Sequence, residues 1–408
     1  MLLYSWNEVG IMDRIVIHID VNNAFLSWTA VEMLKNGSKI DIRNRYAIIG
    51  GDEQARRGIV LAKSNPCKQK GVVTAETIYI ARRKCPYLEV YKPDYELYKR
   101  YSNLMYNYLL QYTNIIERYS IDECFLEYTD IQKLNGDPVE FAYKIKDDIY
   151  KLFGFTVNVG VANNKLCAKM ASDFSKPNKV HTLFKNEIES KLWPLPISDL
   201  FMIGKKTSKK LIDLNIKTVN DLAHTDLNFL EKQFKSMGLM MYNYANGIDN
   251  SKVEYEYENP KSISTSTVLA YNYSNKNQIY QVLKELSFET GSRLRKKKMY
   301  ASSIGVWIKY SDFSKVSKQI KLDNSTNLNE DIYRIAISLF DKLWNEESIR
   351  ALCVKVADLS ENKKTQLSIF DNNLNKNNDR LQKTIDEIKD KYGDNLILYA
   401  DDLINKRN

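Results

Sequence analysis

The sequence has few cysteines, and their number and spacing argue against both a disulfide framework and a zinc site. Five cysteines are scattered over 408 residues, their number is odd, and no two are spaced as C-x-x-C. A disulfide framework needs paired cysteines, and a structural zinc site needs clustered ones. We therefore expect reduced thiols with mainly structural roles.

Long hydrophobic runs are also missing. The composition is 44% hydrophobic and 27% charged, but no stretch approaches the roughly 18 uninterrupted apolar residues of a membrane span. The opening segment carries Glu8 where a secretory signal would be apolar. The sequence therefore predicts a cytoplasmic globular protein without a membrane partner.

Basic residues outnumber acidic ones. There are 60 Lys and Arg residues against 51 Asp and Glu, which gives a net charge of +9. Such an excess favours a polyanionic partner such as nucleic acid, but it can equally serve solubility alone. The tail from Lys363 to Asn408 is nearly balanced in sign, so the excess lies in the body of the protein.

The length predicts several domains, because single cores stop growing near roughly 250 to 300 residues. Apolar and β-branched patterns in the first 161 residues predict a strand, a helix, two strands, a helix and a strand, at 14–21, 22–35, 114–119, 124–128, 141–153 and 155–161. This is the split βαβ order of ferredoxin-like folds.

The character of the sequence changes after His181. Pro194 and Pro196 precede short helical segments at 198–247, and the acidic, tyrosine-rich stretch 253–260 predicts a linker. A separate α+β domain is expected next, with strands at 263–269, 302–310, 316–322 and 351–359 and helices at 278–298 and 329–344. A low-complexity spacer at 372–378 and an amphipathic segment at 381–392 follow.

Three acidic residues stand where predicted strands end or turn. Asp20 closes the first strand, and Asp122 and Glu123 lie near the turn between the next two. Three gathered carboxylates could hold two Mg²⁺ ions, one activating an attacking hydroxyl and the other stabilising a leaving pyrophosphate. An isolated Asp-Glu pair more often only begins a tight turn, and spacing alone leaves both interpretations open.

Three longer segments carry a family resemblance. IDVNNAFLSW (19–28), YSIDECFLEYTD (119–130) and GVANNKLCAKMASDFSKPN (160–178) resemble the three signature blocks of the Y-family DNA polymerases, in the same order and with similar spacing. The resemblance covers nearly the whole chain. It implies an α+β right-hand polymerase with a ferredoxin-like palm (1–23 and 94–182), small fingers (24–93), a helical thumb with a helix-hairpin-helix (183–250), a linker (251–260), an α+β little finger (261–361) and a clamp-binding tail (362–408).

The resemblance also implies an activity and a metal site. Asp20, Asp122 and Glu123 would be the catalytic metal ligands for two Mg²⁺ ions, with help from the backbone carbonyl of Val21. The implied reaction is template-directed extension of a primer 3′-hydroxyl with dNTPs, as error-prone translesion synthesis on primer-template DNA. The chain length leaves no room for a proofreading exonuclease, so low fidelity is expected.

Further positions match the family's nucleotide site. Phe25 falls at the steric-gate position, where an aromatic ring excludes a ribose 2′-hydroxyl; the alternative is an ordinary core phenylalanine. The backbone amides of Asn23 and Ala24, at a strand-to-helix junction, are expected to cradle the triphosphate.

Two lysines are expected to bind the triphosphate as mobile point charges. Lys176 matches the triphosphate lysine of the third block, and Lys68 corresponds to a basic residue of the fingers. Many family members have a tyrosine three residues before the latter position, where this sequence has Asn65. For either lysine the alternative is solvated surface charge.

The DNA contacts implied by the resemblance lie in two places. Residues 198–223 resemble a helix-hairpin-helix, which offers backbone amides to a DNA phosphate around Gly204 and Lys205, although Met202 replaces the usual first glycine. In the little finger, Arg293, Arg295 and Lys297 belong to a basic run whose bias continues onto strand-like segments. A charge run is otherwise usually a solvated face.

The segment QLSIF resembles the peptide that binds the bacterial sliding clamp, through Gln366, Leu367, Ile369 and Phe370. A final strand or helix end that packs internally is the alternative. The family also includes enzymes that act with accessory SOS factors, so dependence on such partners stays open.

Two other functions are compatible with parts of the pattern. A non-catalytic DNA-binding protein would keep the fold without activity, and a nucleotide cyclase would share the palm and the metal chemistry. The three carboxylates argue against the first. A clamp peptide, thumb and little finger argue against the second.

Overall fold

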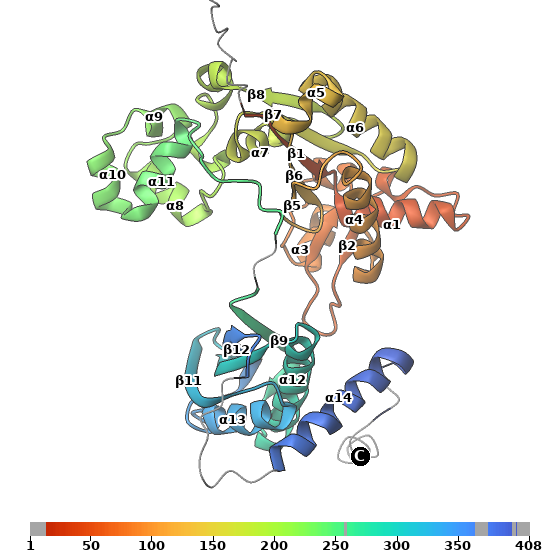
Figure 1. The fold of residues 1–408 in the computed structure, drawn as a ribbon, viewed down its shortest axis with the longest axis vertical. Coiled ribbons are helices and arrows are strands. Elements are labelled where there is room, and N and C mark those ends of the chain that lie inside the picture. Colours follow the sequence, from red (N-terminus) through yellow and green to blue (C-terminus); the bar gives the residue numbers. More distant parts are fainter. Residues whose placement is uncertain (1–13, 257–258, 364–373, 394–396, 398–408) are drawn as a thin grey trace, which may run out of the picture. The chain divides into compact units, whose positions relative to one another are not determined.

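The computed structural model describes residues 14–256, 259–363, 374–393 and 397. The chain forms two compact units, each with its own core (Figure 1). The first unit holds the chain up to Gly51 and from Ile59 to Tyr257; the second holds Asp52–Gly58 and the chain from Glu258 onward. Among the described residues, no helix has the length and apolarity needed to cross a membrane.

A five-stranded sheet organises the first unit. Its order is β5 (Ile116–Arg118), β6 (Glu123–Glu127), β1 (Val16–Val21), β7 (Val157–Ala162) and β8 (Val180–Leu183). The first four strands pair antiparallel, and β8 runs parallel to β7. The first four have the order of the predicted split βαβ arrangement, so the ferredoxin-like prediction is confirmed. The edge strand β8 was not predicted.

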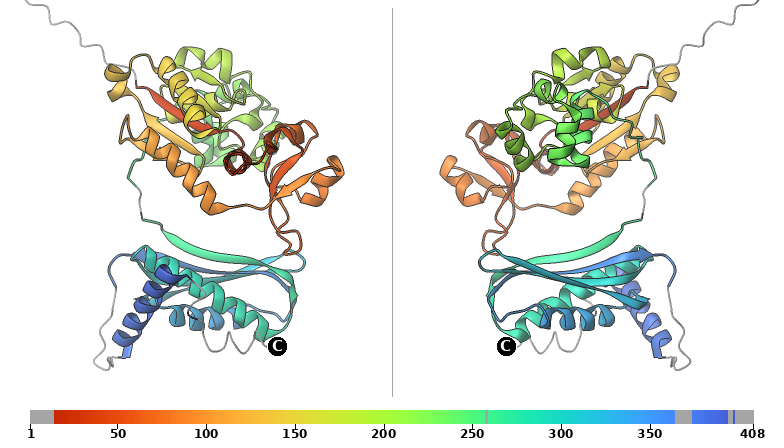
Figure 2. Two further views of the ribbon diagram at one scale, coloured as in Figure 1. Left: turned by 90° about the vertical axis from the view of Figure 1, so that its right-hand side faces the viewer. Right: turned by 90° about the vertical axis from the view of Figure 1, so that its left-hand side faces the viewer.

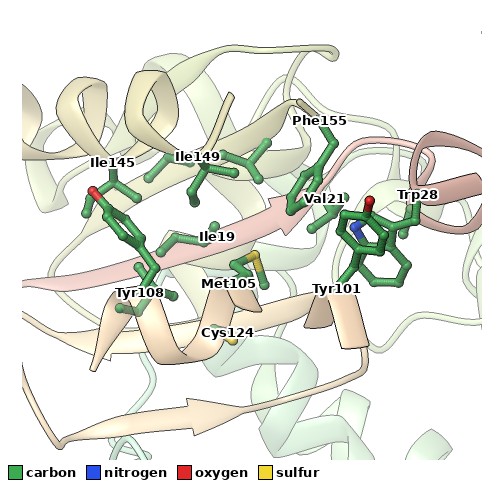
Figure 3. Close-up of a cluster of buried hydrophobic side chains, with 14 of the residues drawn as sticks. Ile19, Val21, Trp28, Tyr101, Met105, Tyr108, Cys124, Ile145, Ile149 and Phe155 are labelled. Carbon is green, nitrogen blue, oxygen red and sulfur yellow. The ribbon is translucent and has the colours of Figure 1, made fainter. Parts of the chain in front are cut away.

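Helices bury both faces of this sheet, which is why every residue of β1 is buried. Its alternate residues Ile17, Ile19 and Val21 belong to one apolar cluster with α1 (Ala24–Lys35), α4 (Tyr95–Leu109) and α6 (Pro138–Phe153) (Figure 3). The other set, Val16, His18 and Asp20, faces α7 (Lys165–Asp173). The short α5 (Gln132–Asn135) precedes α6.

A smaller sheet, in the order β3 (Val60–Lys63), β2 (Ala47–Gly50) and β4 (Glu89–Tyr91), has a core of its own with α2 (Asn65–Gln69) and α3 (Ile78–Lys84).

Farther along the chain, α8 (Lys205–Asp213), α9 (Val219–Ala223), α10 (Leu227–Phe234) and α11 (Ser236–Ala245) form the predicted run of short helices. The predicted linker is partly anchored, because Val253 is buried and the Glu254 N–H donates to Glu117 (2.8 Å).

The second unit is a four-stranded antiparallel sheet with two helices packed on one face (Figure 2). Its order is β11 (Lys315–Thr326), β10 (Tyr300–Tyr310), β12 (Ile349–Ser360) and β9 (Ser262–Tyr273), and the helices are α12 (Lys276–Lys296) and α13 (Asn329–Asp341). The strands are longer than predicted, because polar residues occupy their exposed positions, as with Ser262, Ser264 and Ser266 of β9. A last helix, α14 (Leu374–Tyr392), follows.

Candidate active site

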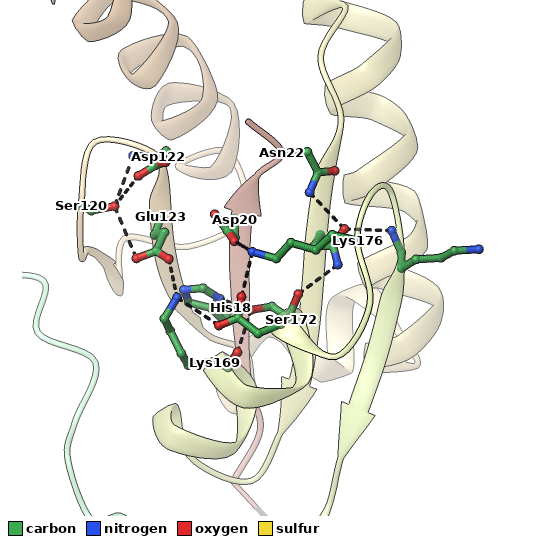
Figure 4. Close-up of polar contacts among 12 residues, drawn as sticks. His18, Asp20, Asn22, Ser120, Asp122, Glu123, Lys169, Ser172 and Lys176 are labelled. Carbon is green, nitrogen blue, oxygen red and sulfur yellow. Dashed lines mark hydrogen bonds and ion pairs between the residues drawn. The ribbon is translucent and has the colours of Figure 1, made fainter. Parts of the chain in front are cut away.

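Strand register brings the predicted carboxylates together. In the antiparallel β1–β6 pair, Asp20 lies opposite Glu123. The Val21 N–H donates to the carbonyl of Asp122 (3.0 Å), which extends the pairing by one residue. All three acidic side chains therefore come from adjacent backbone at the same end of the two strands (Figure 4).

The helix α7 supplies the polar partners for this face of β1. The His18 Nδ1 and Ser172 Oγ lie 2.8 Å apart, and Lys169 forms an ion pair with Glu123. Lys169 is only 9% exposed. Sequence reasoning missed its role, although it lies inside the third signature block, because nothing local to α7 says which strand the helix covers.

The loop after α7 is fixed by buried side-chain amides. Asn158 donates to the carbonyls of Ser172 (2.9 Å) and Ser175 (2.6 Å). On the other side of Lys176, the Asn178 N–H donates to the side-chain oxygen of Asn22 (2.8 Å). The loop backbone is thus anchored before and after Lys176.

From this loop the Lys176 ammonium reaches two carboxylates. It forms ion pairs with Asp20 and with Asp173, the latter at 2.7 Å. The third carboxylate, Asp122, accepts a hydrogen bond from Ser120 Oγ (2.7 Å). Ser120 Oγ also lies 3.4 Å from Glu123 Oε2, so Asp122 and Glu123 share one hydroxyl partner, whereas Asp20 is paired with Lys176 (Figure 4).

The pKa shifts follow from burial and from these partners. Burial raises the pKa of Asp20, and the adjacent Lys176 opposes that rise. Burial also raises the pKa of Asp122, against the hydrogen bond from Ser120. For Lys169 and Lys176, burial acts to lower the pKa, but the neighbouring carboxylates outweigh it and raise it. The site concentrates acidic groups that need cationic neutralisation.

The carboxylates could bind a hard cation such as Mg²⁺ once Asp20 and Glu123 exchange their present lysine partners for the metal ion. Among the described residues, no three His, Cys, Asp or Glu side chains are gathered as a ready metal cage, since Glu123 points to Lys169 and Asp20 to Lys176. Yet carboxylate and carbonyl oxygens are the donors that Mg²⁺ prefers, and two lysines now supply the positive charge. The donor set fits a divalent cation.

A cavity of about 280 Å³ opens beside these carboxylates. It brings together most of the residues predicted for nucleotide and metal binding, and it adds Lys63 from β3. Glu123 does not line this cavity. The residues that line it are Asp20, Val21, Asn22, Asn23, Ala24, Phe25, Leu61, Ala62, Lys63, Asn65, Lys68, Thr74, Asp122, Lys176 and Pro177.

Phe25 forms a fixed part of the cavity wall. Its half-buried ring stacks on Tyr98 with centroids 4.3 Å apart and planes 5° apart, and Tyr95 meets it edge-on at 6.0 Å. The Tyr98 hydroxyl lies 3.3 Å from Thr29 Oγ1. These contacts hold the ring at one position.

The first turn of α1 also borders the cavity. Asn23 precedes the helix in the left-handed conformation (φ 48°, ψ 48°) and does not cap it with its side chain; its Nδ2 instead lies 3.4 Å from Asn65 Oδ1. The first backbone N–H groups of a helix lack intrahelical acceptors and carry partial positive charge. At Ala24 and Phe25 they therefore suit an anion.

The predicted hairpin phosphate site differs from the usual pattern. Met202 has a φ of +69°, the conformation that normally favours glycine. Gly204 precedes α8 with a φ of −77°, and a Cβ there would meet nothing within 4 Å. Lys205 is exposed. The strained position is therefore Met202.

The predicted basic residues Arg293 and Arg295 of α12 and Lys297, directly after it, separate into two groups. Arg293 and Lys297 are exposed, and Arg293 donates to the carbonyl of Ser264 (2.9 Å). Arg295 turns inward and is 12% exposed; its Nε and Nη2 pair with Asp386 of α14 at 2.5 and 3.0 Å. Residues two apart lie on different faces of a helix, so Arg295 anchors α14 instead of facing solvent.

The predicted clamp-binding residues Gln366, Leu367, Ile369 and Phe370 lie outside the described residues.

Comparisons with known proteins identify the family of this chain. The sequence model of the impB/mucB/samB family matches residues 19–173, the model of its C-terminal domain matches 260–369, and that of a DNA polymerase-iota thumb domain matches 198–249. DNA polymerase IV of Clostridium acetobutylicum is 47% identical over 95% of this chain and 98% of its own length. DNA polymerase IV 1 of Bacillus subtilis is 32% identical over 94% of this chain and 92% of its own length.

Among solved structures, a Y-family DNA polymerase chimera matches 85% of this chain and all of its own, with a TM-score of 0.73 and 26% identity. The family models, the relatives and the solved structure agree on one class of enzyme. This chain belongs to the impB/mucB/samB family of Y-family DNA polymerases and is a DNA-directed DNA polymerase of the bacterial translesion type.

Proposed function

We propose that Asp20, Asp122 and Glu123 are the carboxylates at which this polymerase joins a dNTP to the primer 3′-hydroxyl. The observation that carries the proposal is the β1–β6 register, which aligns Asp20 with Glu123 beside a cavity containing lysines. Two Mg²⁺ ions held by these groups and the Val21 carbonyl would activate the hydroxyl and neutralise the pyrophosphate.

The lysines and the helix end would hold the triphosphate. Lys176, now paired with Asp20, can exchange that carboxylate for phosphate oxygens once a cation neutralises Asp20. Lys68 and the backbone amides at Asn23, Ala24 and Phe25 would complete the anion site. Binding of metal and nucleotide would thus replace the lysine pairs observed here.

The proposal is tested by primer extension with Mg²⁺. Asp122→Asn and Glu123→Gln keep the side-chain shape but remove a charged metal ligand, so we expect extension to fall at least about 1,000-fold. Glu96→Gln, an exposed carboxylate on α4, is the matched control. Near-normal extension by either site variant, with the control also normal, would refute the assignment. Mn²⁺ binding followed by electron paramagnetic resonance gives a readout independent of activity.

Phe25 is proposed as the steric gate. The ring is held by Tyr98 and Tyr95, so it cannot easily yield to a 2′-hydroxyl. Phe25→Ala is expected to reduce the preference for dCTP over CTP about 100-fold, measured as the ratio of kcat/KM values, whereas Phe25→Tyr preserves it. An unchanged ratio in the alanine variant would exclude Phe25 as the gate.

Two DNA-contact regions and a clamp peptide complete the proposal. The DNA phosphates would be contacted by Gly204, Lys205, Arg293 and Lys297. Arg295 is left out of this set because its guanidinium is already paired with Asp386. Gln366, Leu367, Ile369 and Phe370 would bind the sliding clamp.

The clamp peptide is tested with Gln366→Ala combined with Phe370→Ala. This variant should lose stimulation by the clamp and retain unstimulated extension; retained stimulation would refute the assignment. The same assay without any added protein tells whether accessory SOS factors are required.

A further inference from the structure

Lys63, the last residue of β3, borders the cavity and has no carboxylate ion-pair partner among the residues that the structure describes. Its ammonium donates to Thr74 Oγ1 at 3.0 Å. Within the described residues Lys63 forms no ion pair, and the carboxylate of Glu76 is already paired with Lys84 at 2.5 Å. The charge of Glu76 opposes the lowering of the Lys63 pKa, but no carboxylate in the described part of the chain forms an ion pair with Lys63.

A second unneutralised ammonium stands close by. Lys68 of α2 borders the same cavity and forms no ion pair with any described residue. Burial lowers the pKa of Lys63, and the charge of Lys68 lowers it further. Two like charges held near one another raise the free energy of the empty site, and a multiply charged anion would relieve that repulsion.

The two sides of the cavity differ in how their charges are balanced. At the carboxylate side, Lys176 is paired with Asp20 and Asp173. At the β3–α2 side, Lys63 and Lys68 lack such partners among the described residues. A ligand that meets both sides should carry bound cations at one end and uncompensated negative charge at the other, which describes a metal-bound nucleoside triphosphate.

The neighbouring sequence explains why an additional lysine would be useful. Asn65 stands where many family members have a tyrosine, and its side chain lies 3.4 Å from Asn23 Nδ2. An asparagine has a shorter reach than a tyrosine. The flexible four-carbon stem of Lys63 brings a charged donor to the same wall of the cavity from the end of the adjacent strand.

We propose that Lys63 is a third triphosphate-binding lysine, which leaves Thr74 and contacts the non-bridging phosphate oxygens of the incoming dNTP, thereby taking over the phosphate contact that Asn65 is too short to make. The proposal rests on the assignment of this cavity as the dNTP site. It adds a residue that this chain uses for nucleotide affinity, with no part in proton transfer or metal binding.

The decisive measurement is single-nucleotide insertion by Lys63→Met, which keeps the apolar stem and removes the charge. We expect the KM for dNTP to rise about tenfold, the effect of losing one charge-assisted hydrogen bond, with kcat nearly unchanged. Lys63→Arg should restore most of the affinity. Lys70→Met, an exposed lysine of the same segment that does not border the cavity, is the matched control.

A second readout separates phosphate binding from a structural role. Inorganic tripolyphosphate should inhibit the wild-type enzyme more strongly than Lys63→Met, while the thermal unfolding midpoint stays the same in both. An unchanged KM and unchanged inhibition would overturn the proposal, as would an equal effect of Lys70→Met. If Asp122→Asn still abolishes extension in that case, only the role of Lys63 fails; if Asp122→Asn remains active, the assignment of the active site fails as well.

Discussion

The carboxylate site of the first unit and strand β11 of the second unit use lysines in opposite ways. Lys169 and Lys176 are packed against acidic partners, and Lys169 is almost completely buried. Lys318 and Lys321 project from an edge strand, and neither forms an ion pair with any described residue. A buried pair fixes the position of each group at a desolvation cost, whereas exposed lysines create a diffuse positive field suited to phosphates.

The strongest test of this difference is Lys169→Met. Removing one partner of a buried ion pair leaves the Glu123 charge uncompensated, so we expect the free energy of unfolding of the metal-free protein to fall by about 3 kcal/mol. Chemical denaturation followed by fluorescence measures it. Lys321→Met, the exposed counterpart, should change the free energy by less than about 0.5 kcal/mol. Equal effects of the two variants would remove the distinction between the regions.

Arg295 is the residue of the second unit that resembles the buried lysines of the first. Its guanidinium also donates to the Asn327 carbonyl (2.6 Å) and to Asn329 Oδ1 (2.9 Å), which orients it toward Asp386. Asp386→Asn should weaken the docking of α14 by about 1 kcal/mol, measured as faster amide exchange in that helix. Arg293→Gln, on another face of α12, should not alter the exchange. Faster exchange in both variants would argue against a specific anchor.

The smallest effects are expected on β11. Replacing Lys318 and Lys321 together by alanine should weaken primer-template binding only several-fold and reduce the log–log salt slope by about 2, because each lost phosphate contact accounts for about 0.9. Fluorescence anisotropy at several salt concentrations measures this. Lys133 and Lys151, exposed on α5 and α6, provide the control pair. A salt slope that the β11 variant leaves unchanged would exclude these lysines as phosphate contacts.

Local patterns were sufficient to predict the central strands and helices. The apolar run before Asp20 and the two short strands on either side of Asp122 each carry their own periodicity, and the structure has β1, β5 and β6 there. The small sheet β3-β2-β4 was not predicted: its strands have only three or four residues and give little periodic signal, and, unlike the equally short β5, none of them adjoins a predicted strand in the sequence. Helix α4 was missed as well, and its tyrosine-rich segment contributes Tyr98 to the wall behind Phe25.

For the candidate site, too, local sequence patterns predicted some residues and missed others. Motif spacing identified Asp20, Asp122, Phe25 and Lys176, whose assigned roles remain predictions. It did not identify Lys63, because a lysine at the end of a strand is usually solvated. It also grouped Arg295 with Arg293 as surface charges, although only the contact with Asp386, 91 residues away, shows that Arg295 faces inward.

The sequence by itself determined the family, the order of the strands and helices around the carboxylates, and the acidic residues at the strand ends, since these depend on residues close together in the chain. The tertiary structure alone decided which charges are paired and which are left without a partner. That outcome depends on packing α7 against β1 and bringing β3 and α2 to the same cavity. Burial and distance set the strength of a charge interaction, and neither quantity can be read from the order of residues.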